Sequence, residues 1–331
     1  MGQTLVILPI SRPNQVVING GFTIAQQGSN LNFLVIDSSI VTLDRWSWGH
    51  VAGGAENVNA SGSVSQIPFP LGQTEVPGNP RYYCRITNTS VGSLGAGSYA
   101  ALTQGIEDVR MLAGMTLTLS FYARSSIPNK RLGAEFSQFF GWGGSTHFSA
   151  GSKGFILTNT FKRYIFTATM PSVFGKTLVA GHNLTLLLWL QSGVNLAPRG
   201  GFAGGFEWGG TGTTDLANIQ IDVGNQAAPC QPHNVAQDLR QCLRYLWVAN
   251  GELLGITRDV NHVFSHGIVR FPVPMRATPT MINGLVGIGG GVSAPLGMAA
   301  PTPYSTGLYN LASNYPIGIG VQFSALFDAN I

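Results

Sequence analysis

The sequence predicts an all-β fold of two β-sandwich, jelly-roll-like domains joined by one short α-helix. Three observations support this prediction. Apolar and polar residues alternate along many short segments, which is the pattern of half-buried strands. Glycine-rich turns separate these segments, and the 331 residues include 44 glycines and 18 prolines. A single segment near residues 235–246 has apolar residues at helical spacing instead.

The chain is predicted to begin with an extended arm, residues 1–17, followed by a first domain, residues 18–228. The arm has an apolar stretch, and Pro9 and Pro13 disfavour a helix there. We expect it to become ordered by docking onto another protein, for example by adding a strand. In the first domain, residues 16–18 are expected to form a strand that ends in the turn Asn-Gly-Gly at 19–21.

Residues 184–190 are apolar at nearly every position, so they are predicted to form a central strand that is buried on both faces. The second domain, residues 229–331, begins with a proline-containing linker and the helix. Asn234 suits the N-cap, and Gln237 follows three residues later. The helix is predicted to span about residues 234–248, and strands and turns are predicted for the remainder of the chain.

Composition excludes several classes of protein. Only 10% of the residues are charged, against roughly 25% in an average globular protein, and the net charge is +4. Basic residues are scattered, which argues against a nucleic-acid-binding surface. The apolar stretch at residues 5–10 is too short for a signal peptide or a membrane span, so no membrane insertion is expected. Three cysteines without CxxC spacing fit a reducing cytoplasm better than a disulfide framework.

The sequence contains none of the motifs of a nucleophile elbow, a zinc protease or a P-loop. A glycosidase needs two carboxylates that flank the sugar. Glu135, Glu207 and Asp215 are the candidates, and we expect them to have structural or solvated roles instead. The chain is therefore predicted not to be an enzyme, with a polysaccharide-degrading enzyme as the most distant alternative.

Aromatic residues beside glycines are the clearest functional signal. Trp142 lies in Gly-Trp-Gly-Gly, and Trp208 lies in Phe-Glu-Trp-Gly-Gly, so both are predicted to lie in loops. A flat indole can stack on the apolar face of a sugar, and a nearby polar group such as His147 can bind hydroxyls. The predicted glycan-binding residues are therefore Trp142, His147 and Trp208. The alternative is that each indole covers the core or a contact between subunits. Trp46, Trp189 and Trp247 are expected in the core.

Several segments together resemble a family of bacteriophage virion proteins. They are residues 19–28, followed by Asp-Arg-Trp at 44–46; residues 114–121; residues 213–222; Cys-Leu-Arg-Tyr at 242–245, which is similar to the family's "CQRYY" motif; and residues 271–280. Leu243 replaces the glutamine of that motif, and Leu246 replaces its second tyrosine. Family members are commonly tail-fibre or other appendage proteins, and their front half resembles carbohydrate-binding jelly rolls.

This resemblance implies a short homotrimeric tail-fibre or appendage protein that binds host glycans, with about 17 residues before the first domain and no fibre shaft. It implies assembly in the host cytoplasm, location in the virion, and attachment to other virion proteins through the N-terminal arm. No cofactor is expected, but related sugar-binding jelly rolls often hold a structural calcium ion, for which Asp215 and Asp222 are the candidates. The alternative for each is a turn-capping role. The competing function is a capsid decoration or tail connector protein without receptor binding.

Overall fold

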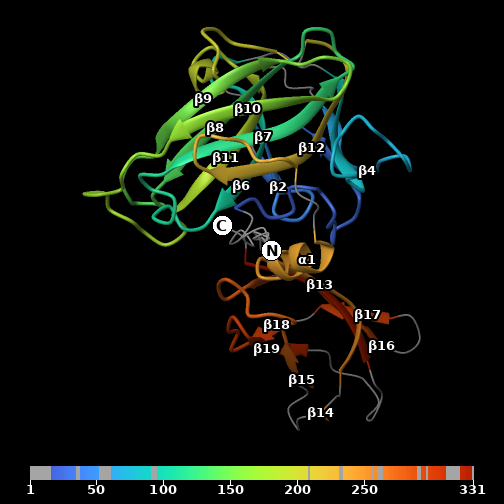
Figure 1. Cartoon of the computed structure of the whole chain (residues 1–331). Helices are drawn as coiled ribbons and strands as arrows, with labels where there is room; N and C mark the ends of the chain where they lie inside the picture. The colour runs from blue at the N-terminus through green and yellow to red at the C-terminus, as the bar shows by residue number, and fades with distance from the viewer. Residues whose placement is uncertain are drawn as a thin grey trace, which may run out of the picture.

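The computed structural model describes residues 16–34, 38–51, 61–90, 95–207, 209–230, 234–254, 257–258, 264–288, 292–295, 297–310 and 321–329. The fold is all-β and consists of two β-sandwiches, with a short helix between them (Figure 1). This confirms the predicted fold class. Residues 1–15 of the expected arm lie outside the described residues, whereas Val16 and Val17 pack against the core of the first sandwich.

The first sandwich contains two antiparallel six-stranded sheets. One sheet has, in spatial order, β1 (Asn30–Leu34), β4 (Ser61–Pro68), β5 (Tyr82–Ser90), β12 (Gly212–Val223), β7 (Thr116–Ser125) and β10 (Lys162–Thr169). The other has β2 (Ser38–Val41), β3 (Ser47–Val51), β6 (Tyr99–Ile106), β11 (Asn183–Ser192), β8 (Arg131–Phe139) and β9 (Phe148–Ile156). A 3-10 helix, η1 (Ala197–Gly200), lies between β11 and β12.

The second sandwich contains two four-stranded antiparallel sheets. One has β13 (Leu246–Leu254), β20 (Val321–Asp328), β16 (Thr280–Ile288) and β17 (Val292–Pro295). The other has β14 (Thr257–Arg258), β15 (Phe264–Arg270), β19 (Ser305–Asn310) and β18 (Gly297–Ala299). The rings of Trp247, Phe271 and Phe327 form the centre of its core, with centroids 5.2–5.7 Å apart.

Alternation along the strands builds the first core. Leu117, Leu119 and Phe121 of β7 face inward and are fully buried together with Leu186 and Leu188 of β11. Strand β11 lies between β6 and β8, as expected for a central strand. Its outward-facing Trp189 is also buried, because the connection between β11 and β12 covers it with Phe206. Burial of apolar side chains on both faces therefore fixes β11 in the middle of the sheet.

Residues 16–18 do not form the expected strand. The backbone N–H and C=O of Ile18 bind the side-chain amide of Gln104, at 2.9 and 2.8 Å. Asn19 adopts a left-handed conformation (φ 56°), and its side chain bonds to the backbone of Ile24 and Asp44. Because side chains satisfy these backbone groups, the segment turns without joining a sheet.

The predicted helix exists but is shorter than expected. Among the described residues, α1 (Val235–Cys242) is the only α-helix, and its N-cap is Asn234, whose Oδ1 accepts hydrogen bonds from the backbone of Ala236 and Gln237. The extension to residue 248 is wrong, because β13 starts at Leu246 and pairs with β20. Strand pairing and burial of Trp247 thus outweigh the helical spacing of the sequence. No helix among the described residues is long and apolar enough to cross a membrane.

Polar contacts join the two sandwiches just after α1. The guanidinium of Arg45 lies 3.5 Å from the ring centroid of Tyr245, and the Tyr245 hydroxyl donates a hydrogen bond to Glu107. Arg276 forms an ion pair with the same carboxylate at 3.2 Å. Gln26 of the first sandwich donates to the carbonyl oxygen of Leu246 at 2.9 Å. These contacts fix the start of the second sandwich against the first.

A close backbone approach holds the connection between β11 and β12 against its sheet. A methyl group added at Gly133 would lie 2.4 Å from the carbonyl oxygen of Gly200. We predict that Gly133→Ala lowers the free energy of unfolding by about 1–3 kcal/mol, because the backbone of η1 must move away. Chemical denaturation followed by tryptophan fluorescence measures this change. Gly204→Ala is the control, since its added methyl meets no atom within 4 Å. Equal stability of the two variants would contradict the prediction.

Candidate functional site

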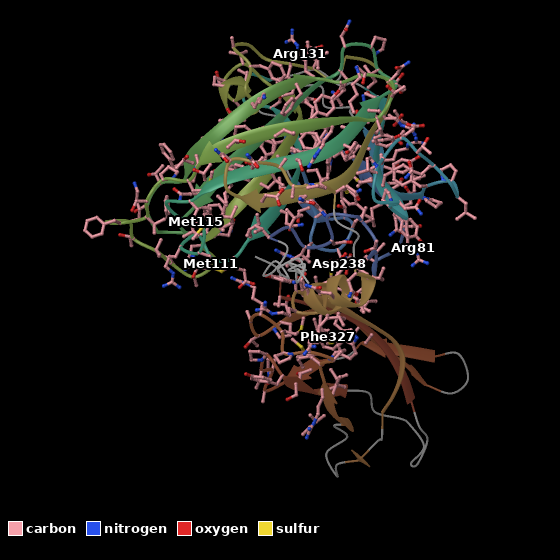
Figure 2. All side chains as sticks on the ribbon, in the orientation of Figure 1. Arg81, Met111, Met115, Arg131, Asp238 and Phe327 are labelled. Carbon is pink, nitrogen blue, oxygen red and sulfur yellow. The ribbon has the colours of Figure 1, made fainter. Side chains whose placement is uncertain are left out.

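Three loops meet at one end of the first sandwich. They are residues 107–115, 140–147 and 170–182, which we call the aromatic end. Strand registers place them together, because Phe139 pairs with Asn183 and Thr116 pairs with Thr169. Gln138 of one sheet donates to the carbonyl oxygen of Pro171, which follows the other sheet, at 2.9 Å. Figure 2 shows Met111 and Met115 at this end and Arg131, the first residue of β8, at the opposite end.

Trp142 is exposed in a turn whose glycines are required. Its side chain is 88% exposed. Gly141 and Gly143 on either side adopt left-handed conformations (φ 88° and 84°), which favour glycine. A methyl group at Gly141 would also lie 2.4 Å from the carbonyl oxygen of Val179. The indole makes an edge contact with Phe139, with centroids 5.6 Å apart. The turn therefore presents most of the ring to solvent.

Hydrogen bonds join the Trp142 loop to the neighbouring loop. The Val179 N–H donates to the Phe140 carbonyl at 2.9 Å, and the Ser145 N–H donates to the Thr177 carbonyl at 3.0 Å. The Thr177 N–H donates in return to Ser145 Oγ at 2.9 Å. Backbone bonds in both directions fix the two loops against each other, so the exposed ring is held on an ordered support.

The second loop adds another exposed ring. Phe174 is 94% exposed, and Gly175 follows it in a left-handed conformation (φ 75°). Sequence reasoning missed Phe174, although an aromatic residue beside a glycine is the same signal that identified Trp142. Large apolar side chains exposed at or beside this end are Met111, Met115, Trp142, Phe148, Phe174 and Val179. Exposed apolar side chains that gather in one place are typical of binding surfaces, so this end is the candidate functional site.

The structure places the three predicted glycan-binding residues differently. Trp142 and His147 lie in the same loop, and both are exposed. Trp208 lies outside the described residues. Its described neighbours Glu207 and Gly209 line a pocket with residues 129–131, next to the start of β8. That pocket is at the end of the sandwich opposite Trp142, so the two predicted loops are not brought together.

Asp215 is not available as a calcium ligand. Its carboxylate is buried and accepts hydrogen bonds from Arg85 Nε at 2.7 Å, Arg85 Nη2 at 2.9 Å and Arg124 Nε at 2.9 Å. Two guanidinium groups would repel a cation at this position. The partners could not be identified from sequence because they lie on β5 and β7, which are distant along the chain.

Asp222 also has a structural role. Its Oδ2 accepts hydrogen bonds from Gln220 Nε2 at 2.8 Å and from the backbone N–H of Ala228 at 2.9 Å, which closes the turn after β12. Asp222 lies seven residue steps along β12 from Asp215, a span of roughly 23 Å, so the two carboxylates cannot share one ion. In the described part of the chain, no cluster of three His, Cys, Asp or Glu residues could hold a metal.

Glu135, another of the carboxylates considered for sugar hydrolysis, has the structural role expected of it. Glu135 is fully buried and accepts hydrogen bonds from Trp189 Nε1 at 3.0 Å and Arg199 Nε at 2.9 Å. The guanidinium of Arg199 in turn lies 5.3 Å from the Trp189 ring centroid. Glu135 thus anchors η1 on the outer face of the sheet, whereas Glu207 is exposed. This arrangement gives Glu135 a structural role.

The pocket beside Glu207 has a volume of about 180 Å³ and is lined by residues 129–131, 205–207 and 209. Beneath it the Lys130 side chain is buried, and its Nζ donates to the carbonyl oxygen of Leu190 at 2.6 Å. Burial lowers the pKa of Lys130 to about 7. The ammonium is therefore partly deprotonated at neutral pH, in contrast to an exposed lysine.

Comparisons with known proteins give partial likenesses. No family model matches the chain, and no curated protein matches it. Among solved structures, a CBM4 structure is 15% identical over 62% of this chain and 98% of its own (TM-score 0.33). The enzymatically active domain of tailspike protein 4 from bacteriophage CBA120 is 15% identical over 63% of this chain and 21% of its own (TM-score 0.32).

The C-terminal family 22 carbohydrate binding module of Clostridium thermocellum Xyn10B is 10% identical over 61% of this chain and 96% of its own (TM-score 0.32). At these identities and TM-scores, the likenesses assign neither a ligand nor a site to this chain.

The buried Lys130 predicts a pH dependence of stability. The unfolded chain keeps the lysine protonated up to a pKa of about 10.4, whereas the folded chain releases the proton near pH 7. The free energy of unfolding of the wild type should therefore rise, relative to Lys130→Met, by on the order of 2 kcal/mol between pH 7 and pH 9. Urea denaturation at a series of pH values measures it. The exposed Lys153→Met variant should follow the wild type, and parallel curves for all three proteins would refute the prediction.

The exposure of Trp142 predicts that it contributes little to stability. Trp142→Ala should change the free energy of unfolding by less than about 0.5 kcal/mol, because almost no buried contact is lost. The matched variant Trp189→Ala removes a buried ring that binds Glu135 and should cost about 3–5 kcal/mol. Thermal and urea denaturation compare the two. A large loss of stability in Trp142→Ala would show that the ring belongs to the core.

Proposed function

We propose that this chain is a bacteriophage virion protein that binds glycans of the host surface through the aromatic end. The observation that carries the glycan-binding part is the exposed Trp142 ring in a turn fixed by two left-handed glycines. The C–H face of a pyranose is apolar and flat, so it can stack on such a ring, and each contact contributes on the order of 1 kcal/mol. Phe174 in the adjoining loop offers a second ring for the same chain of sugars.

The virion role follows from the family resemblance of the sequence. In this proposal the chain forms a homotrimer in a short tail appendage, and the arm that precedes Val16 attaches it to other virion proteins. Three aromatic ends on one trimer would act together, because binding of the first site raises the effective concentration at the others. A single weak site, with a Kd near the millimolar range, would then be enough for attachment.

A capsid decoration or tail connector protein is the second candidate. The exposed methionines Met111 and Met115 favour it, because flexible methionine side chains suit contacts with another protein. In that role the aromatic end would face a neighbouring virion protein and no sugar would bind. The two functions differ in what is lost when Trp142 is removed.

We predict that Trp142→Ala weakens binding of the purified protein to host cells by about fivefold per site, since one stacking contact is lost. Trp142→Phe should retain part of the affinity, because it keeps a ring. Leu71→Ala is the matched control: Leu71 is equally exposed, but on the turn between β4 and β5. Cell binding measured by fluorescence on labelled protein tests this.

The results separate the two candidate functions. If Trp142→Ala binds cells like the wild type but is incorporated into particles less efficiently, the decoration or connector role is the better description. Loss of cell binding with normal incorporation supports the receptor-binding role.

A further inference from the structure

The aromatic end belongs to a part of the chain without acidic residues. Between Glu135 and Glu207 the sequence contains no aspartate or glutamate, whereas it contains Lys153, Lys162, Arg163, Lys176 and Arg199. This segment includes strands β9, β10 and β11 and the two loops that carry Trp142 and Phe174. The surface around both exposed rings is therefore free of carboxylates from its own segment.

The loop at residues 107–115 contributes two carboxylates to the aromatic end, and both are already paired. Asp108 accepts from Arg110 Nε at 2.9 Å and lies 3.2 Å from His182 Nδ1. Glu107 binds Tyr245 and forms an ion pair with Arg276 at the contact with the second sandwich. Neither carboxylate therefore neutralises the remaining cation of this end, Lys176.

Lys176 is positioned beside the Trp142 loop. Its backbone N–H donates to the Val173 carbonyl at 3.1 Å, and the next residue, Thr177, is bonded to Ser145. Its exposed ammonium lies 5.7 Å from the ring centroid of Phe140, two residues before Trp142. Among the described residues Lys176 forms no ion pair with a carboxylate. The aromatic end thus combines exposed rings with one exposed, uncompensated positive charge.

We infer that the aromatic end selects acidic glycans, that is, sugar chains that carry carboxylate or other anionic groups. This inference rests on the proposed function and specifies its ligand class. A sugar ring would stack on Trp142 while its anionic substituent pairs with Lys176. Because the pair is exposed, its effect is modest and is screened by salt, so the preference should be a few-fold at low ionic strength and should disappear at high salt.

The test uses pairs of polymers that differ only in charge. The probes are polygalacturonate, alginate and hyaluronate, each compared with its own carboxyl-reduced form, in which the carboxylates have become hydroxymethyl groups. Affinity is measured by biolayer interferometry at 20 mM and 500 mM NaCl. The wild type is expected to bind at least one acidic polymer three- to tenfold more tightly than its reduced form at 20 mM salt. The difference should vanish at 500 mM salt.

Variants assign this preference to the site. Lys176→Gln should weaken binding of the acidic polymer about three- to fivefold and leave the reduced polymer unchanged. Lys162→Gln is the matched control, because Lys162 is an exposed lysine of the same segment at the far end of β10. Trp142→Ala should weaken both polymers equally. Each variant is compared only after its melting temperature is shown to equal that of the wild type.

The outcomes distinguish this inference from the proposed function. Equal binding of acidic and reduced polymers, or a Lys176→Gln variant that retains the full preference, overturns the inference while glycan binding stands. Failure of every polymer to bind, or binding that Trp142→Ala leaves unchanged, counts against the proposed function and the inference together.

Discussion

The packing of two six-stranded sheets over one apolar core is the constraint on which the site depends. Strands β8 and β11 are paired in register from Phe139 and Asn183 to Gly133 and Trp189, and their inward-facing leucines and phenylalanines are buried. The loops that follow β8 and precede β11 therefore start from fixed points. Hydrogen bonds between these loops, such as that from Val179 to Phe140, hold the turn that presents the Trp142 ring to solvent. Stability is supplied by the core, so the ring is free to bind.

Charged residues are few, and two buried carboxylates hold arginines of the first sandwich in place. Asp215 ties Arg85 and Arg124 together across three strands, and Glu135 holds Arg199 against the outer face of a sheet. Both of these buried carboxylates have at least one guanidinium partner, which offsets part of their desolvation. The segment between Glu135 and Glu207, which includes β9, β10 and β11, has few charged residues, and all of them are positive. An exposed lysine on such a surface attracts anions without competition from neighbouring carboxylates.

Strand alternation and turn residues predicted the fold class, the central strand β11 and the N-cap Asn234. The helix end could not be predicted, because the helical spacing continues to Leu246, whereas residues 246–248 pair with β20, which is distant in sequence. The ion pairs of Asp215, a calcium candidate by its position, could not be predicted for a similar reason: its partners lie 130 and 91 residues away. For the site, the sequence identified Trp142 from its glycines, but the convergence of its loop with Phe174 and Lys176 depends on strand register.

The most direct test is a nuclear magnetic resonance titration of the tryptophan indole N–H signals with an oligosaccharide of the host surface. The Trp142 signal is assigned from the Trp142→Phe variant, and the buried Trp46 and Trp189 serve as internal references. We predict that the Trp142 signal shifts in a saturable manner while the two reference signals stay in place. Saturable binding with an unchanged Trp142 signal would contradict the claim that the aromatic end is the glycan site.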